Sequence, residues 1–272
     1  MTEIPEQPTD EKAIVRWVDV CKAFDDNIVL DGVSLDVHRG DTLVIIGQSG
    51  TGKSVLVKTL LGLVTPDSGD VIVEGRSILK SRRAMSSSLK LLGMVFQNSA
   101  LFDSLSVAEN LALPYWENSD WPVERILERC SELLEMVGMR GVESLYPAEL
   151  SGGMKKRIGL ARALADEPEI IIYDEPTTGL DPIMSDAINR LIVRIQEEVK
   201  VTSIVITHDM STVQKTADHV ALLHAGQIIF YGTPEELFAS DDGYVQQFIR
   251  GTVEGPIGTS ASEHTGDMMG DG

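Results

Sequence analysis

One glycine-rich run of eight residues, GQSGTGKS at 47–54, limits the possible folds of this chain more than any other feature. The segment DTLVIIG at 41–47 predicts a buried strand before it, and SVLVKTLLGL from Ser54 onward has helical spacing. Glycines at 47, 50 and 52 allow successive backbone amides to turn inward, and the helix directs its positive end at the same point. The run therefore predicts a phosphate-binding loop.

The loop supplies a set of candidate nucleotide contacts. Lys53 is expected to bridge the β- and γ-phosphates, and the Ser54 hydroxyl to coordinate Mg²⁺. A Gly/Ser turn that matches the pattern by chance is the alternative, and the flanking strand and helix disfavour it. The candidates are Gly47, Gln48, Ser49, Gly50, Thr51, Gly52, Lys53 and Ser54.

A second motif, EIIIYDE at 169–175, ends an apolar strand with two carboxylates. Asp174 could hold Mg²⁺ through water, and Glu175 could polarise an attacking water, which is the Walker B arrangement. A strand that ends in Asp-Glu is also common as a capped turn. The phosphate-binding loop upstream gives the metal and catalytic interpretation its weight.

A third motif, LSGGM at 150–154, precedes the basic helical segment KKRIGLARAL. Ser151, Gly152 and Gly153 would present bare amides at a helix N-terminus, which is an anion site. The loop at 47–54 already surrounds the phosphates of one nucleotide. A second phosphate-reading helix start therefore suggests a site completed by another subunit.

Together these motifs make the sequence resemble the ATP-binding cassette (ABC) family over residues 14–240. The resemblance implies an ATPase that uses ATP and Mg²⁺ and works as a homodimer with two nucleotides between the subunits. Glu175 and His208, in ITHD, are the implied catalytic residues, and His208 matches the switch histidine. The implied metal ligands are Ser54, Gln97 and Asp174. Three further residues match family positions. Phe24 matches the aromatic residue that stacks on adenine, and Gln97 in MVFQ and Asp181 in GLDP match the other two nucleotide-site positions.

Most of these residues carry little weight alone. An isolated Phe24 is more often a packing residue, and an isolated His208 is more often a capping or surface histidine. Their order and spacing favour the nucleotide-binding interpretation. The remaining histidines match no motif and receive no role: His38, His219, His224 and His264.

The alternation of short apolar strands with helical segments predicts an α/β fold of the P-loop NTPase (RecA-like) class, with a mostly parallel sheet. We expect an antiparallel β subdomain and an inserted α-helical subdomain at about 104–163, where apolar residues recur at three- and four-residue intervals. Cys130 lies on that apolar stripe and is expected in the core. The stripe consists of Ile126, Leu127, Cys130, Leu133, Leu134 and Val137. A further helix is expected from DAINRLIVRIQEEV at 186–199. The expected domains are a disordered arm at 1–12, the ATPase at 13–250 and a largely disordered extension at 251–272.

The composition limits the kinds of partner that this chain can bind and the compartment that suits it. The 42 acidic and 23 basic residues give a net charge of −19, which repels nucleic-acid phosphates over most of the surface. The two cysteines show no metal-binding or disulfide spacing, which suits a reducing compartment. No segment approaches the roughly 18 apolar residues of a membrane span. The resemblance to ABC transporters implies a peripheral position at the cytoplasmic face of the inner membrane, and in that position other subunits must cross the bilayer.

The third motif, LSGGM at 150–154, corresponds to the signature motif of the ABC family. It departs from the usual family pattern at Met154, where glutamine is common. LSGGMKKR, with GMVFQNSALFDSLSVAENLALP at 93–114, resembles the ATPases of Mla/Mce-linked lipid transporters. YVQQFIRGTVEGPIG at 244–258 resembles the short C-terminal extension of that group, which can reach the neighbouring ATPase. The resemblance implies permease subunits, lipid-binding Mce-type subunits and a small regulatory subunit. Two alternatives remain: the ATPase of another ABC importer, for amino acids or similar compounds, and a soluble cassette ATPase without a permease.

The segment after Gln97 is the expected contact with the membrane partner. Leu101, Phe102 and Leu105 are candidate docking residues there. An equally weighted alternative is that these side chains belong to the core of the helical subdomain.

Overall fold

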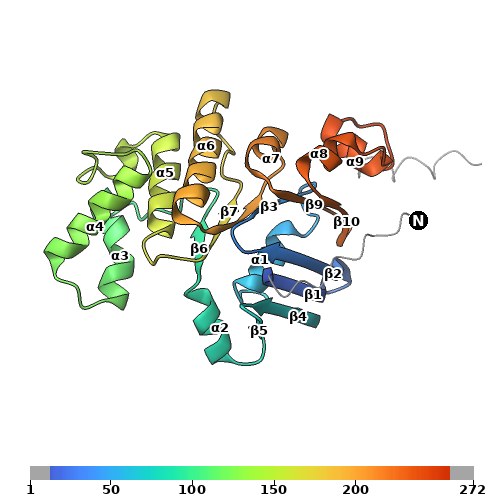
Figure 1. Cartoon of the computed structure of the whole chain (residues 1–272), viewed down its shortest axis with the longest axis horizontal. Helices are drawn as coiled ribbons and strands as arrows, with labels where there is room; N and C mark the ends of the chain where they lie inside the picture. Colours follow the sequence, from blue (N-terminus) through green and yellow to red (C-terminus); the bar gives the residue numbers. More distant parts are fainter. Residues whose placement is uncertain (1–12, 258–272) are drawn as a thin grey trace, which may run out of the picture.

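The computed structural model describes residues 13–257 and centres on a six-stranded sheet in the order β10-β9-β3-β8-β7-β6 (Figure 1). Five neighbouring strands run parallel, and β10 pairs antiparallel with β9 at one edge. The strands are β3 (Thr42–Ile46), β6 (Leu92–Val95), β7 (Ile170–Asp174), β8 (Thr202–Ile206), β9 (His219–His224) and β10 (Gln227–Gly232).

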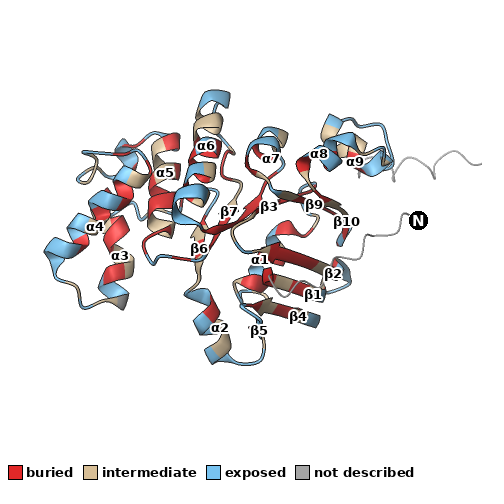
Figure 2. Ribbon diagram, viewed as in Figure 1, coloured by how far each residue is buried: buried red, intermediate tan, exposed pale blue. Residues whose placement is uncertain are grey.

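The central strands are apolar on both faces, and each face contributes to a different core. In β3, Val44 and Ile46 join the core beneath the helices, whereas Leu43 and Ile45 join the core shared with the second sheet. Strand β7 alternates in the same way. This period-two division explains why these strands appear in the sequence as continuous apolar runs. Figure 2 shows the same strands as buried.

The second sheet is antiparallel and has the order β2-β1-β4-β5. Helix α1 (Lys53–Leu60) joins it to the phosphate-binding loop, because the Trp17 Nε1 atom donates to Thr59 Oγ1 at 3.1 Å and both residues are buried. The strands are β1 (Ala13–Phe24), β2 (Asn27–His38), β4 (Ser68–Val73) and β5 (Arg76–Ser77).

The remaining helices cover the central sheet and its edges. Helices α3, α4 and α5 gather at one end of the molecule, beyond β6, while α8 and α9 lie near β9 and β10 (Figure 1). Their bounds are α2 (Arg82–Leu89), α3 (Val107–Asn118), α4 (Val123–Met136), the short 3-10 helix η1 (Pro147–Glu149), α5 (Gly152–Ala163), α6 (Pro182–Val199), α7 (Met210–Thr216), α8 (Pro234–Ala239) and α9 (Gly243–Arg250). No helix within residues 13–257 combines the length and apolar content needed to cross a bilayer.

The structure confirms the expected α/β fold, including the parallel sheet, the antiparallel sheet and the group of helices. Helix α6 begins at Pro182, four residues before the expected start, because Asp181 caps it and proline suits its first turn. Cys130 is in the core as expected, whereas Leu127 of the same stripe is 49% exposed. The expected arm at 1–12 and the end of the extension, from 258, lie outside the described residues.

Candidate functional site

The carboxyl ends of three neighbouring strands bring the predicted motifs together. Strand β3 leads into the glycine-rich loop, β7 ends at Asp174 and Glu175, and β8 leads to His208. Since the sheet order is β3-β8-β7, these three exits are adjacent although the segments are far apart in sequence. This edge is where open α/β sheets place their ligand sites.

The loop wraps closely around the Lys53 ammonium. Lys53 Nζ donates to the carbonyl oxygens of Gly47 at 2.7 Å and Gln48 at 2.8 Å, and the residue is only 8% exposed. Burial lowers the pKa of Lys53, while the charges of Glu175 and Asp174 oppose that shift. The ammonium therefore lies in the field of the carboxylate pair.

Two glycines of the loop are required by close backbone approach. Gly47 has φ of 155°, and a Cβ there would lie 2.4 Å from the Leu223 carbonyl oxygen. Gly52 has φ of 105°, and a Cβ there would lie 2.7 Å from the Val29 carbonyl oxygen. Any larger residue would push the loop away from β9 or β2.

The oxygen groups at this edge fit a hard divalent cation. Burial, and then the charge of Glu175, raise the pKa of Asp174, while Lys156, Lys58 and Lys53 oppose the shift. A bound cation would relieve this crowding of negative charge. The Ser54 hydroxyl is exposed at the start of α1, so an all-oxygen donor set of the kind Mg²⁺ prefers is available.

Glu175 and His208 are in direct contact. His208 Nδ1 lies 3.0 Å from Glu175 Oε1, and the Thr178 hydroxyl donates to Glu175 Oε2 at 3.0 Å. The Glu175 side chain is 16% exposed and that of His208 is 65% exposed. This carboxylate is therefore oriented through both of its oxygens, beside a histidine that faces solvent.

Lys156 belongs to this site, although the sequence reasoning did not single it out. Its Nζ donates to the carbonyl oxygens of Gln97 at 2.5 Å and of Glu175 at 3.1 Å. Burial lowers the pKa of Lys156, with the charges of Asp174 and Glu175 opposing. The sequence feature that pointed to this residue was the basic run after LSGGM. Because α5 packs on β6, one lysine of that run has to point inward.

The N-terminal tip of α5, which carries the signature motif, lies apart from the glycine-rich loop of its own chain. Ser151 caps α5 by accepting from Met154 N at 3.3 Å, and Ser151 and Gly152 are exposed. Helix α5 packs on β6, and two strands separate β6 from β3. With strands about 4.8 Å apart, β3 and β6 are roughly 14 Å apart. The tip is therefore available to a different molecule.

The other three predicted residues occupy different surroundings. Phe24, at the end of β1, is 45% exposed and has Lys22 Nζ at 5.3 Å from its ring centroid. Gln97 is exposed, and its carbonyl oxygen is held by Lys156. Asp181 Oδ1 accepts from the backbone nitrogens of Ile183 and Met184 at 2.9 and 3.0 Å, so it caps α6.

Comparison with known proteins gives a family match and two groups of relatives. The family model described as ABC transporter matches residues 30–178. The chain is 40% identical, over 85% of its length and 88% of the relative, to the intermembrane phospholipid transport system ATP-binding protein MlaF of Haemophilus influenzae. It is 38% identical, over 91% of its length and 68% of the relative, to the methionine import ATP-binding protein MetN of Mesorhizobium japonicum.

Among solved structures, the chain is similar to a dimeric ATP-binding cassette in a post-hydrolysis state bound to ADP and Pi. The TM-score is 0.73 at 28% identity, with 81% of this chain and 98% of the other covered.

Proposed function

This chain is an ATP-hydrolysing member of the ABC transporter family, and from that premise we propose that it drives phospholipid transport at the cytoplasmic face of a bacterial inner membrane. The contact of Glu175 with His208 beside Lys53 supports ATP hydrolysis. The 40% identity to a phospholipid-transport ATPase supports the lipid substrate. We further propose that, like the dimeric cassette to which it is similar, it forms dimers, and that it works with permease subunits.

We assign the catalytic roles to Glu175 and His208. Glu175 would accept a proton from the attacking water, and its two oxygens are already directed by His208 and Thr178. His208 is exposed enough to reach a γ-phosphate at the protein surface. Lys53 would exchange its two carbonyl partners for phosphate oxygens, and the amides of 47–52 would surround the β-phosphate.

Ser54, Asp174 and Gln97 are the proposed Mg²⁺ ligands. When bound, the cation would neutralise charge on the β- and γ-phosphates. Asp174 would supply the charge, and the exposed side chains of Ser54 and Gln97 would supply neutral oxygens.

Dimerisation would complete the nucleotide site. Ser151, Gly152 and Gly153 are too far across the sheet to serve their own loop, and two of the three are exposed. In a head-to-tail pair, this helix tip of one protomer would contact the γ-phosphate held by the other. Asp181 would lie at the same interface, and Phe24 would stack on adenine. Hydrolysis would remove the shared γ-phosphate and favour opening.

The surface around Phe102 is the proposed permease contact. Phe102 is 56% exposed, whereas Leu101 packs partly against the main core. Buried Asn110 fixes this loop, since its Oδ1 accepts from Phe102 N at 2.8 Å and its Nδ2 donates to the Leu105 carbonyl oxygen at 3.1 Å. A rigid loop that presents an exposed aromatic ring suits a docking surface.

The lipid assignment also draws support from the signature motif, because LSGGMKKR resembles the corresponding segment of the Mla/Mce-linked lipid-transport ATPases. Met154 replaces an amide with a thioether but leaves the Ser151 hydroxyl and the glycine amides in place. The methionine is half-buried against the main core, so it serves packing as well. Lipid-binding Mce-type subunits and a small regulatory subunit are the further partners that this assignment implies.

Reconstitution tests the proposal. The chain would be combined in phospholipid vesicles with Mce-type subunits and their permease, or with a permease and binding protein for amino acids. We expect ATP hydrolysis to rise only with the lipid set and to depend on Phe102. Stimulation by the amino-acid set alone would favour the methionine-importer alternative, which rests on the 38% identity to such a protein. Recovery of ribosomes or DNA, without membrane subunits, on a tagged chain would favour a cassette ATPase without permease.

A further inference from the structure

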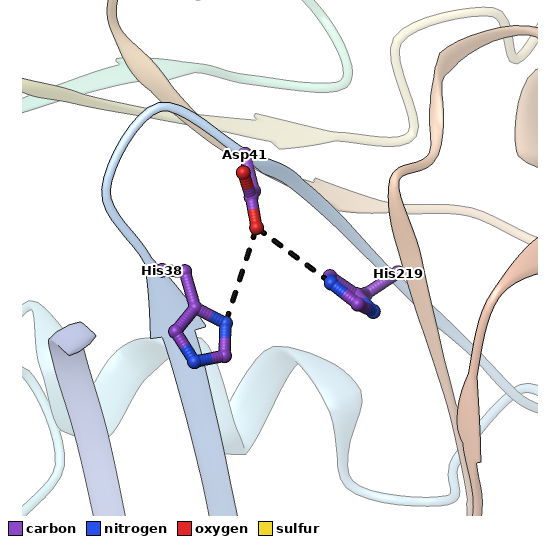
Figure 3. Close-up of side chains that lie close together, drawn as sticks. All are labelled: His38, Asp41 and His219. Carbon is purple, nitrogen blue, oxygen red and sulfur yellow. Dashed lines mark ion pairs between the residues drawn. The ribbon is translucent and has the colours of Figure 1, made fainter. Parts of the chain in front are cut away.

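Three titratable side chains, His38, Asp41 and His219, lie close together in Figure 3. They meet at the amino edge of the central sheet, whereas the nucleotide site lies at its carboxyl edge. His38 ends β2, Asp41 precedes β3, and His219 begins β9. One donor atom from each lies within 4.8 Å of the other two. The sequence reasoning gave neither histidine a role, because they are 181 positions apart (219 − 38) and share no motif.

The backbone brings these side chains together. Asp41 N donates to the His38 carbonyl oxygen at 3.2 Å, and Gly40, with φ of 85°, allows that tight turn. On the other side, Asp218 Oδ2 accepts from Thr42 N at 2.7 Å, and Asp218 N donates back to the Thr42 carbonyl oxygen at 2.9 Å. These reciprocal bonds hold the start of β9 against the start of β3. The cluster therefore rests on three fixed strand ends.

The distances describe a shared centre. Asp41 Oδ2 lies 3.9 Å from His38 Nδ1 and 3.6 Å from His219 Nε2, and both separations are too long for hydrogen bonds. A metal ion at about 2.0–2.2 Å from each ligand in tetrahedral geometry would separate the ligand atoms by about 3.3–3.6 Å. The two Asp41 separations need to change by only a few tenths of an ångström, and the donor atoms of the two histidines lie within 4.8 Å of each other. All three side chains are partly exposed, at 24%, 35% and 31%, and are therefore able to rotate towards a common centre.

The surroundings favour a cation. Asp218, whose carboxylate is bonded to Thr42 N, adds a second negative charge close to Asp41. The His219 ring is stacked on Tyr231, with 5.5 Å between centroids and an interplanar angle of 8°, so its orientation is restrained. Excess negative charge and a restrained imidazole are both features of a metal site.

We propose that His38, Asp41 and His219 bind a divalent transition metal ion, with Zn²⁺ as the best match and a water molecule as the fourth ligand. Two imidazole nitrogens and one carboxylate oxygen suit Zn²⁺, Co²⁺ or Ni²⁺ and do not suit Mg²⁺, which prefers an all-oxygen set. The ion would tie β2 of the antiparallel sheet to β3 and β9 of the parallel sheet.

This site is separate from the nucleotide site. The six residue steps from Asp41 through β3 to Gly47, at about 3.3 Å each, place roughly 20 Å between Asp41 and the glycine-rich loop. The ion would therefore stabilise the junction of the two sheets and take no part in hydrolysis. Binding to the folded protein alone would raise its Tm.

The test is Zn²⁺ titration of the full chain, with any affinity tag removed, after chelator treatment and without nucleotide. We expect saturable one-to-one binding by calorimetry and a rise in Tm. Asp41→Asn and His219→Gln should each weaken binding by about tenfold or more and remove the Tm rise. His224→Gln, at the far end of the same strand β9, is the matched control and should bind as the wild type does.

Cobalt provides the second measurement. The visible spectrum of the Co²⁺-loaded chain should show nitrogen and oxygen ligands without a thiolate band, which separates this site from Cys21. Basal MgATP hydrolysis of the His219→Gln variant should equal that of the wild type. Absence of saturable Zn²⁺ binding by the wild-type chain, or undiminished binding by both variants, would overturn the proposal.

Discussion

His208 Nδ1 lies 3.0 Å from Glu175 Oε1, although the two residues are 33 positions apart. Their contact arises because β7 and β8 are adjacent parallel strands whose carboxyl ends leave the sheet together. Thr178 holds the second oxygen of the same carboxylate. The orientation of the proposed base is thus set by contacts within the chain itself.

Replacing Glu175 by glutamine should abolish most hydrolysis and preserve ATP binding. The amide keeps the size of the side chain and can still contact His208 and Thr178, but it cannot accept the proton of the attacking water. We expect steady-state phosphate release to fall by about 10²–10⁴-fold. An ATP-dependent dimer should accumulate on size-exclusion chromatography. Glu169→Gln, just before the other end of β7, is the control, and wild-type turnover in Glu175→Gln would remove Glu175 from its role.

Replacing Lys53 by alanine should weaken nucleotide binding itself. Charged hydrogen bonds to phosphate contribute about 1.5–3 kcal/mol, so ATP affinity should fall by roughly 10- to 150-fold. Titration with a fluorescent ATP analogue measures this directly. Lys58→Ala, on the exposed side of the same helix, should leave affinity nearly unchanged. Equal affinity of the Lys53→Ala and wild-type proteins would contradict the phosphate-loop assignment.

Replacing Lys156 by methionine should lower kcat more than it changes KM for ATP. The variant keeps the apolar stem but loses the bonds to the Gln97 and Glu175 carbonyl oxygens, so the backbone beneath the base is less firmly held. A loss of about 1–2 kcal/mol in transition-state stabilisation corresponds to roughly a 5- to 30-fold lower kcat. Lys155→Met is the adjacent control. A change confined to Tm, with kcat intact, would limit Lys156 to a structural role.

Replacing Asp174 by asparagine should stabilise the nucleotide-free protein while removing Mg²⁺-dependent hydrolysis. Because the folded state raises the pKa of Asp174, the folded protein binds more protons than the unfolded chain, and this group lowers stability as pH rises. The cost is fully present above the folded-state pKa. The Tm gain of the variant should therefore be largest near neutral pH and shrink towards about pH 4, the pKa of an unfolded aspartate.

Asp186→Asn provides a control of opposite sign for that experiment. Hydrogen bonds from Lys215 and then Arg190 lower the pKa of Asp186, so its contribution stabilises the protein above the unfolded-state pKa and is lost as pH falls. This variant should have a lower Tm near neutral pH, with a smaller difference in acid. Parallel shifts of both variants in the same direction would contradict the electrostatic explanation.

Much of the fold could be predicted because its signals are local. The continuous apolar runs of β3 and β7 and the Gly47 and Gly52 turns are each encoded within a few neighbouring residues. The early start of α6 was missed because its cap, Asp181, was interpreted only as a nucleotide contact. The exposure of Leu127 was missed because the periodicity of a single helix does not define the width of the face that its neighbours cover.

The sequence alone determined the kinds of chemistry present: a phosphate-binding loop, a carboxylate pair after a buried strand, and a serine-glycine helix start, in the order found in one family. Only the tertiary structure decided which distant side chains meet. Sheet order placed His208 against Glu175, packing of α5 on β6 turned Lys156 inward, and the junction of two sheets gathered His38, Asp41 and His219. The physical reason is that these contacts depend on which strands become neighbours, a choice made by burial of whole faces and not by adjacent residues.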